Sequence, residues 1–144
     1  MSLNEPAREP GQARLPRPLA NAILDHVRET PEHEVCGLVI AADGLPQRCL
    51  RLGNLAPDPR DRYVMDPPAL IRALYEIEQA GETLFAIYHS HPLGQAVPSA
   101  IDIADAAYPD AIYLIVTLGM RGVMEMRAWR IRDGRALEMD LEIA

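Results

Sequence analysis

Lysine is absent from this 144-residue sequence, and all fourteen basic residues are arginines. Without lysine, the chain cannot itself carry a ubiquitin-like modifier on a lysine side chain. The arginines are scattered along the sequence, and the formal net charge at pH 7 is −7. Because phosphate binding needs a concentrated cationic face, this distribution argues against nucleic acid as a partner.

Cysteine is scarce as well. Cys36 and Cys49 are too few for a disulfide framework, and their separation of 13 residues matches no paired-cysteine zinc motif. We therefore expect both to be buried free thiols, a common role for cysteine in a hydrophobic core.

Long apolar runs are also missing. No run reaches the roughly 18 residues that span a bilayer, and no basic segment followed by an apolar stretch begins the sequence. We therefore predict a cytoplasmic protein without a membrane partner. Hydrophobic residues make up 49% of the chain and charged residues 24%, which is ordinary globular usage.

Proline punctuates residues 1–18, for which we predict a flexible N-terminal arm, followed by a single domain over residues 19–144. Apolar spacing and turn signals in that domain predict helices from residue 19 to Thr30, from Asp66-Pro67 to Gly81, and over 99–107. Strands are predicted over 35–41, 47–52, 83–90, 111–118, 123–132 and 135–143. This order indicates an α/β fold, specifically an α/β/α sandwich with a mixed sheet.

Two histidines, His89 and His91, stand around the end of the predicted strand 83–90. Because side chains alternate along a strand, Phe85 and Ile87 are expected on the face that carries both histidines. Neighbours on one face lie about 6.5 to 7 Å apart at Cα, close enough for two imidazoles to bind one zinc ion. An isolated His-x-His pair is nevertheless weak evidence, because such pairs also arise by chance.

Ser99 and Asp102 are three residues apart at the start of the predicted helix 99–107. This spacing is typical of a capping box, in which serine caps the helix and the acidic residue complements its N-terminus. The same spacing can direct Asp102 toward the histidines as a third, anionic ligand. Both interpretations stay open on these residues, and the two roles can coexist.

A hydrolytic zinc site has three protein ligands and an open position for a water molecule, whose pKa the ion lowers to about 7. Such a site also needs a general base. Glu34 is the best candidate, because it directly precedes the buried run 35–41, where a polar loop meets the sheet. Other glutamates, including Glu32 and Glu76, have the surroundings of solvated helix or loop residues.

Together these residues resemble the JAMM, or MPN-plus, zinc metalloprotease family. The shared pattern comprises EVCG at 34–37, HSHP at 89–92, and PS at 98–99 followed by Asp102. Seven residues separate His91 from Ser99 and two separate Ser99 from Asp102, as the family pattern requires. The resemblance covers roughly residues 19–131. The chain length and segments 54–57 and 63–67 are similar to those of the small prokaryotic branch.

The resemblance implies a cytidine-deaminase-like fold with one zinc ion per chain, bound by His89, His91 and Asp102. It implies that Glu34 takes a proton from the zinc-bound water and delivers it to the leaving amine. It also implies that Ser99 donates a hydrogen bond to the oxyanion of the tetrahedral intermediate.

Members of the prokaryotic branch are associated with ubiquitin-fold sulfur-carrier proteins. The expected reaction is therefore hydrolysis of the bond after the C-terminal Gly-Gly tail of a ubiquitin-like or sulfur-carrier partner. We expect residues near Met65 and in the loop 93–97 to line a narrow passage for that tail. The partner's identity and the oligomeric state are left open.

Three other functions compete with this one. The main alternative is a catalytically inactive MPN scaffold. Such scaffolds usually lack metal-ligating residues, whereas this sequence has a suitable residue at every catalytic and ligand position of the motif. A zinc deaminase would need His-x-Glu and a downstream Pro-Cys-x-x-Cys, which the sequence does not contain. A DNA-repair-associated relative is disfavoured by the acidic charge and by the EVCG element.

Overall fold

The computed structural model describes residues 11–119 and 123–144. Within these residues the helices are α1 (Arg17–Glu29), α2 (Pro67–Gln79) and α3 (Ala100–Asp105). The strands are β1 (Gln12–Leu15), β2 (Cys36–Ala42), β3 (Leu45–Leu52), β4 (Thr83–Ser90), β5 (Ile112–Leu118), β6 (Met124–Arg132) and β7 (Arg135–Ile143). None of the helices in the described ranges is long and apolar enough to cross a membrane.

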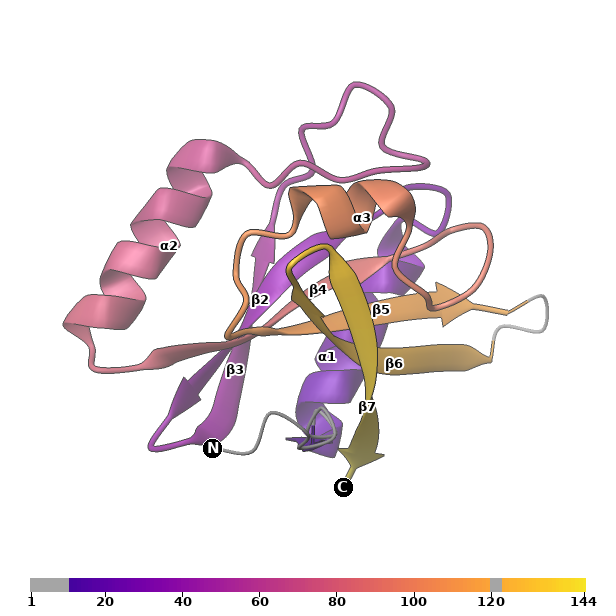
Figure 1. The fold of residues 1–144 in the computed structure, drawn as a ribbon. Helices are drawn as coiled ribbons and strands as arrows, with labels where there is room; N and C mark the ends of the chain where they lie inside the picture. The colour runs from indigo at the N-terminus through magenta and orange to yellow at the C-terminus, as the bar shows by residue number, and fades with distance from the viewer. Residues whose placement is uncertain (1–10, 120–122) are drawn as a thin grey trace.

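The seven strands form one mixed sheet in the order β1-β7-β6-β5-β4-β2-β3 (Figure 1). Strand β4 pairs in parallel with β5, and β1 pairs in parallel with β7. The other neighbouring strands are antiparallel. Because β4 and β5 run in the same direction, their carboxyl ends meet at one edge, where open α/β sheets commonly bind ligands.

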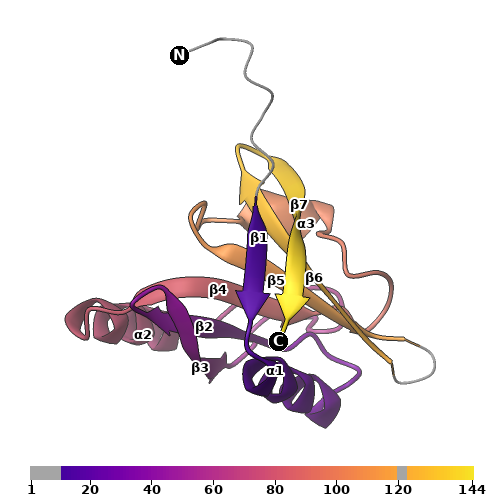
Figure 2. The ribbon, with the colours of Figure 1, turned by 90° about the horizontal axis from the view of Figure 1, so that it is seen from below.

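Helices cover both faces of this sheet, as Figure 2 shows from below. On one face, Ile23 and Val27 of α1 join a core cluster with Tyr88 of β4. On the other face, Ala73 and Ile77 of α2 join a second cluster with Ile115 of β5. The predicted α/β/α sandwich is confirmed.

The predicted flexible arm is wrong for residues 12–15, which form β1 at the edge of the sheet. Leu15 is fully buried, and its carbonyl accepts a hydrogen bond from the N–H of Ala144. The apolar alternation of Ala13 and Leu15 is too short to stand out among prolines, and the pairing partner lies at the far end of the chain. Residues 1–10 of the predicted arm lie outside the described residues, and the single domain over 19–144 stays a prediction.

Strand β4 departs from strict alternation. Val39 of β2 pairs with Ala86, but the next residue of β2 pairs with Leu84, so that Phe85 is an extra residue in a β-bulge. Phe85 therefore packs with the α1-side cluster, whereas Ile87 packs with the opposite cluster. The prediction that Phe85 shares the face of the histidines is wrong, because a bulge interrupts the two-residue period.

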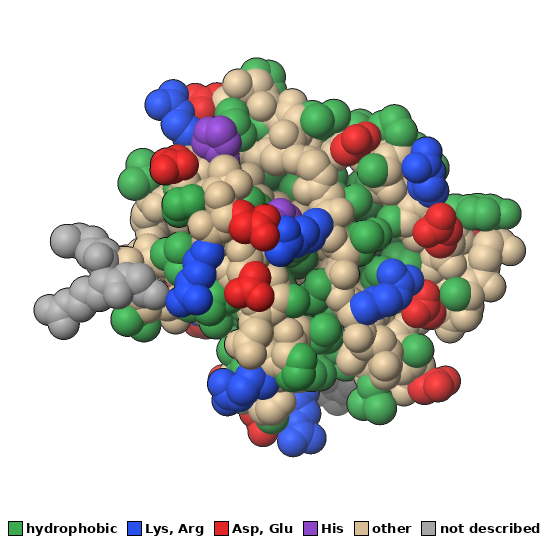
Figure 3. Space-filling view, turned by 180° about the vertical axis from the view of Figure 1, so that it is seen from behind, with side chains coloured by type: hydrophobic (Ala, Val, Ile, Leu, Met, Phe, Trp, Pro, Cys, Tyr) green, Lys and Arg blue, Asp and Glu red, His purple; other side chains and the backbone are tan. Residues whose placement is uncertain are grey.

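Charged side chains of both signs are interspersed on the molecular face drawn in Figure 3. In the described part of the chain, exposed ion pairs join Arg127 with Glu138 and Arg132 with Asp110. On that face the arginines do not form the continuous cationic stripe that nucleic-acid binding needs.

Candidate metal centre

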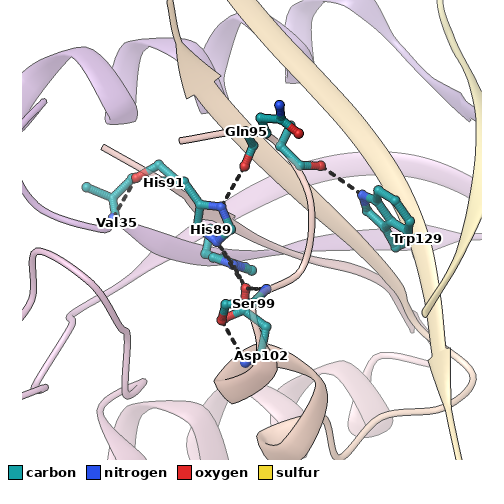
Figure 4. Close-up of polar contacts among 9 residues, drawn as sticks. Val35, His89, His91, Gln95, Ser99, Asp102 and Trp129 are labelled. Carbon is teal, nitrogen blue, oxygen red and sulfur yellow. Dashed lines mark hydrogen bonds and ion pairs between the residues drawn. The ribbon is translucent and has the colours of Figure 1, made fainter. Parts of the chain in front are cut away.

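The two histidines lie at the carboxyl end of β4. His89 is the penultimate residue of the strand, and His91 is the first residue after Ser90, where the strand ends. Their side chains point toward each other (Figure 4), and their Nε2 atoms are 3.1 Å apart. His89 is completely buried. The Nδ1 atom of His91 donates to the Gln95 carbonyl at 2.9 Å, which leaves its Nε2 facing His89.

Asp102 reaches both histidines from the first turn of α3. Its Oδ2 atom lies 3.1 Å from Nε2 of His89 and 3.0 Å from Nε2 of His91. Ser99 caps the same helix: its Oγ accepts from the N–H of Asp102 at 3.0 Å, and its own N–H donates to Oδ2 at 2.9 Å. The capping box is therefore present, and it aims the carboxylate at the histidines. Helix capping by Ser99 and Asp102 and the approach of Asp102 to the histidines, which the sequence left open as alternatives, therefore occur together.

Glu34 lies beside these three residues. One ligand atom from each of Glu34, His89, His91 and Asp102 can be chosen so that all four lie within 4.8 Å of one another. The Glu34 side chain is buried, and its Oε1 atom has no hydrogen-bond partner among the described residues. The next residue, Val35, is hydrogen-bonded to Ser90 at the end of β4. The Val35 N–H donates to Oγ of Ser90, and the Ser90 N–H donates to the Val35 carbonyl.

Burial and hydrogen bonding shift the pKa values of these four groups in different directions. Burial raises the pKa of Glu34 to about 8 and lowers the pKa of His89, so both favour their neutral forms. For Asp102, burial is outweighed by hydrogen bonds from His89 and His91, which hold its pKa well below the usual range. His91 also loses hydration, but its bonds to Asp102 and to the Gln95 carbonyl raise its pKa above the ordinary value.

The donor set fits a divalent transition-metal ion. Two imidazole nitrogens and one ionised carboxylate oxygen converge with pairwise separations of 3.0 to 3.1 Å. Ligands bound tetrahedrally to zinc at about 2.0 to 2.1 Å lie roughly 3.3 Å apart, which is close to these distances. Because the Glu34 carboxylate adjoins the three ligand atoms, the arrangement suits a hydrolytic site better than a purely structural one.

A family comparison agrees with this geometry. The sequence profile described as "Prokaryotic homologs of the JAB domain" matches residues 16–132. This chain belongs to the prokaryotic JAB family. The predicted membership in a small prokaryotic branch of JAMM proteins is confirmed.

Three relatives align with most of this prokaryotic JAB chain. A desampylase from Haloferax volcanii is 36% identical over 129 residues, covering 85% of this chain and 91% of the relative. A CysO-cysteine peptidase from Mycobacterium tuberculosis is 32% identical over 127 residues, covering 87% and 86%. A probable TtuB-protein conjugate cleaving protease from Thermus thermophilus is 38% identical over 111 residues, covering 76% and 74%.

Solved structures share the JAB fold. The solution structure of a Desulfitobacterium hafniense protein superposes with a TM-score of 0.79 at 27% identity, covering 92% of both chains. A JAB1/MPN domain protein from Archaeoglobus fulgidus superposes with a TM-score of 0.59, covering 91% of this chain and 99% of the other. At 18% identity, this second likeness shows the fold alone. The predicted JAMM/MPN fold is confirmed.

A mostly apolar cavity of about 250 Å³ adjoins the candidate metal centre of this JAB protein. Met65 and Ile101 line it together with Asp102, and Tyr63 forms part of the same wall. The expectation that residues near Met65 line a space beside the site agrees with this cavity. The loop 93–97 is not part of the cavity wall, and instead its Gln95 and Ala96 carbonyls accept hydrogen bonds from His91 and Trp129 (Figure 4).

Sequence reasoning missed three residues that support this JAB site. Ser90, the middle residue of His-x-His, binds the backbone beside Glu34. The Tyr63 ring stacks on His89, and Asn54 binds the Glu34 carbonyl. The sequence segments 54–57 and 63–67, which include Asn54 and Tyr63, were noted only for their similarity to the small prokaryotic branch. That similarity does not indicate which side chains these residues contact.

Proposed function

We propose that this chain is a zinc-dependent metallopeptidase or isopeptidase. Its substrate is the C-terminal Gly-Gly tail of a ubiquitin-like or sulfur-carrier protein, and it hydrolyses the bond that follows the tail. The observation that carries the proposal is the convergence of Glu34 with His89, His91 and Asp102 in one buried cluster. The relatives include a CysO-cysteine peptidase and a probable conjugate-cleaving protease, and their names support the same reaction class.

In this proposal, His89, His91 and Asp102 hold the metal ion through the three atoms that converge. Zinc bound there would polarise the scissile carbonyl and lower the pKa of a water molecule. Asp102 contributes the negative charge, which the low pKa of its carboxyl maintains throughout the neutral range. The capping bonds with Ser99 keep that carboxylate from rotating away.

Glu34 is the proposed general base and acid. Its Oε1 atom is buried without a partner among the described residues, so it is free to accept a proton from water and pass it to the leaving amine. Burial raises the pKa of Glu34 to about 8, whereas positive charge nearby favours the ionised form. These opposing influences suit a carboxyl that takes up and releases a proton near neutral pH.

Ser99 is the proposed oxyanion donor. Its Oγ accepts the N–H of Asp102, but its hydroxyl proton makes no hydrogen bond to the described residues. The proton therefore remains available to a developing negative charge on the substrate oxygen. Capping and catalysis use different parts of the same hydroxyl group.

A Gly-Gly tail suits the burial of this centre. Glu34 is 3% exposed, Asp102 7% and His91 9%, so a substrate must approach through a restricted opening. Glycine carries no side chain, and its backbone can therefore approach where a bulkier residue would clash. We expect the reaction in the cytoplasm, with no nucleic acid or membrane as a partner.

The test is cleavage of ubiquitin-fold carrier proteins that end in Gly-Gly-Cys or in Gly-Gly followed by a longer peptide. Product masses identify the bond that is cut. Cleavage should stop on chelation and return when zinc is restored. Glu34→Gln should bind zinc but lose about 10²- to 10⁴-fold in turnover, the usual contribution of a general acid-base group.

Glu32→Gln is the matched control, because Glu32 is exposed and only two residues away. It should cleave like the wild type. Full turnover by Glu34→Gln would show that another group acts as the base, and chelator-resistant cleavage would exclude the metal mechanism. A protein that neither binds stoichiometric zinc nor gains thermal stability from it would instead be the inactive scaffold.

A further inference from the structure

The two histidines of the metal centre are held in different ways. His91 is oriented by the hydrogen bond from Nδ1 to the Gln95 carbonyl. The Nδ1 atom of His89 is buried, yet it has no hydrogen-bond partner among residues 11–119 and 123–144. Metal-binding histidines are almost always oriented by a hydrogen bond from the second ring nitrogen. Some other contact must therefore fix the His89 ring.

Tyr63 supplies that contact. Its ring lies on the His89 ring with 4.4 Å between centroids and 26° between the planes. An offset stack of this kind restricts tilting of the imidazole and leaves the in-plane Nε2 atom free to face His91 and Asp102. The Tyr63 hydroxyl makes no hydrogen bond to the described part of the chain, so the contact with His89 is made by the flat ring alone.

Asn54 fixes the backbone on both sides of Tyr63. Its Nδ2 atom donates to the carbonyls of Arg62 and Glu34 at 3.1 and 2.9 Å. Its Oδ1 atom accepts from the N–H groups of Val64 and Ala56 at 2.9 and 3.0 Å. These four bonds use all the hydrogen-bonding capacity of an asparagine side chain. One side chain thus joins the segment that carries the proposed base to the loop that carries Tyr63.

We propose that Tyr63, held by Asn54, is a positioning residue that orients His89 for metal binding in place of a hydrogen bond to Nδ1. The inference rests on the metal site of the proposed function. Because the aromatic face of residue 63 is the part that orients His89, phenylalanine at this position should preserve metal binding and an aliphatic residue should weaken it.

The experiment measures zinc affinity by competition with a chromophoric chelator, without any substrate. Tyr63→Leu should bind zinc about 10- to 100-fold more weakly, the range typical for loss of a group that orients a ligand. Tyr63→Phe should bind like the wild type. Tyr75→Leu makes the same chemical change at an exposed position on α2 and should leave the affinity unchanged.

Cobalt(II) substitution adds a spectroscopic reading of the ligand geometry. The visible absorption of the cobalt protein should change in Tyr63→Leu and in Asn54→Ala, and it should be preserved in Tyr63→Phe. Circular dichroism in chelator checks that each variant is folded before metal is added. If Tyr63→Leu does not fold, Tyr63→Met takes its place, because methionine fills the apolar site without a flat ring.

Wild-type zinc affinity in a folded Tyr63→Leu or Tyr63→Met protein would overturn the inference. Equal weakening in Tyr63→Phe would also overturn it, because the ring would then not be the cause. Either result leaves zinc binding and tail cleavage by the wild type intact, so the proposed function would stand. A wild-type protein that binds no metal would overturn both.

Discussion

Replacing Gly37 with alanine tests how closely the centre of the sheet is packed beside the candidate metal centre. Gly37 pairs with Tyr88 in the neighbouring strand β4. A Cβ atom on residue 37 would lie 2.5 Å from the Leu50 carbonyl oxygen and 2.5 Å from Cε1 and Cζ of the Tyr88 ring. Optimal contacts between carbon atoms are about 3.5 to 4.0 Å, so these neighbours must move by about 1 Å.

Neither neighbour can move freely. The Leu50 oxygen belongs to the backbone of β3, and the Tyr88 side chain is buried with its hydroxyl 2.6 Å from Nδ1 of His26. Overpacking of a core costs about 1 to 3 kcal/mol, and loss of the hydrogen bond adds about 1 kcal/mol. We therefore expect Gly37→Ala to lower the free energy of unfolding by about 2 to 4 kcal/mol. For a domain of this length, the Tm should fall by about 10 °C.

Thermal and urea unfolding followed by circular dichroism measure this change. Gly53→Ala is the matched control, because a Cβ at residue 53 would meet nothing within 4 Å. It should be neutral or stabilise the protein by up to about 1 kcal/mol through the unfolded state. A Gly37→Ala protein with wild-type Tm would refute the reasoning, since it would mean that the Leu50 carbonyl and the Tyr88 ring make room for a methyl group without loss of stability.

Two further substitutions address the site. His91→Ala should lose stoichiometric zinc after dialysis, because one of three converging ligand atoms is removed; one zinc ion retained per chain would contradict the ligand assignment. Ser99→Ala should raise the catalytic barrier by about 2.7 to 4 kcal/mol through loss of an oxyanion donor and lower stability by about 1 kcal/mol through loss of the cap. Steady-state kinetics and thermal unfolding separate the two effects, and full kcat with a lowered Tm would restrict Ser99 to capping.

Local sequence signals were sufficient for most of the secondary structure. The bounds of β4 and β7 agree with the predicted strands, because apolar alternation and glycine-containing turns act over a few residues. Asp66 caps α2 through Ala69, and Gly81 adopts a positive φ of 68° just after the helix, as the Asp-Pro and Gly signals indicate. The α/β/α class followed from the order of these elements.

Non-local pairing was beyond local signals. Gln12 of β1 pairs with Asp140 of β7, and no pattern within either segment identifies a partner so far along the chain. The bulge at Phe85 depends on how β4 meets β2, so alternation within β4 alone places that side chain on the wrong face.

By itself, the sequence determined which residues are candidates for the proposed metal centre, because the spacing of His89, His91, Ser99 and Asp102 matches a compound pattern. The tertiary structure decided how they meet. Ser99 caps α3, and its own N–H donates to the Asp102 carboxylate that faces the histidines, a combination that depends on three-dimensional hydrogen-bond geometry. The support from Tyr63 and Asn54 arises only when the loop after β3 folds over the end of β4, because stacking and hydrogen bonding depend on distances in space and not on separation along the chain.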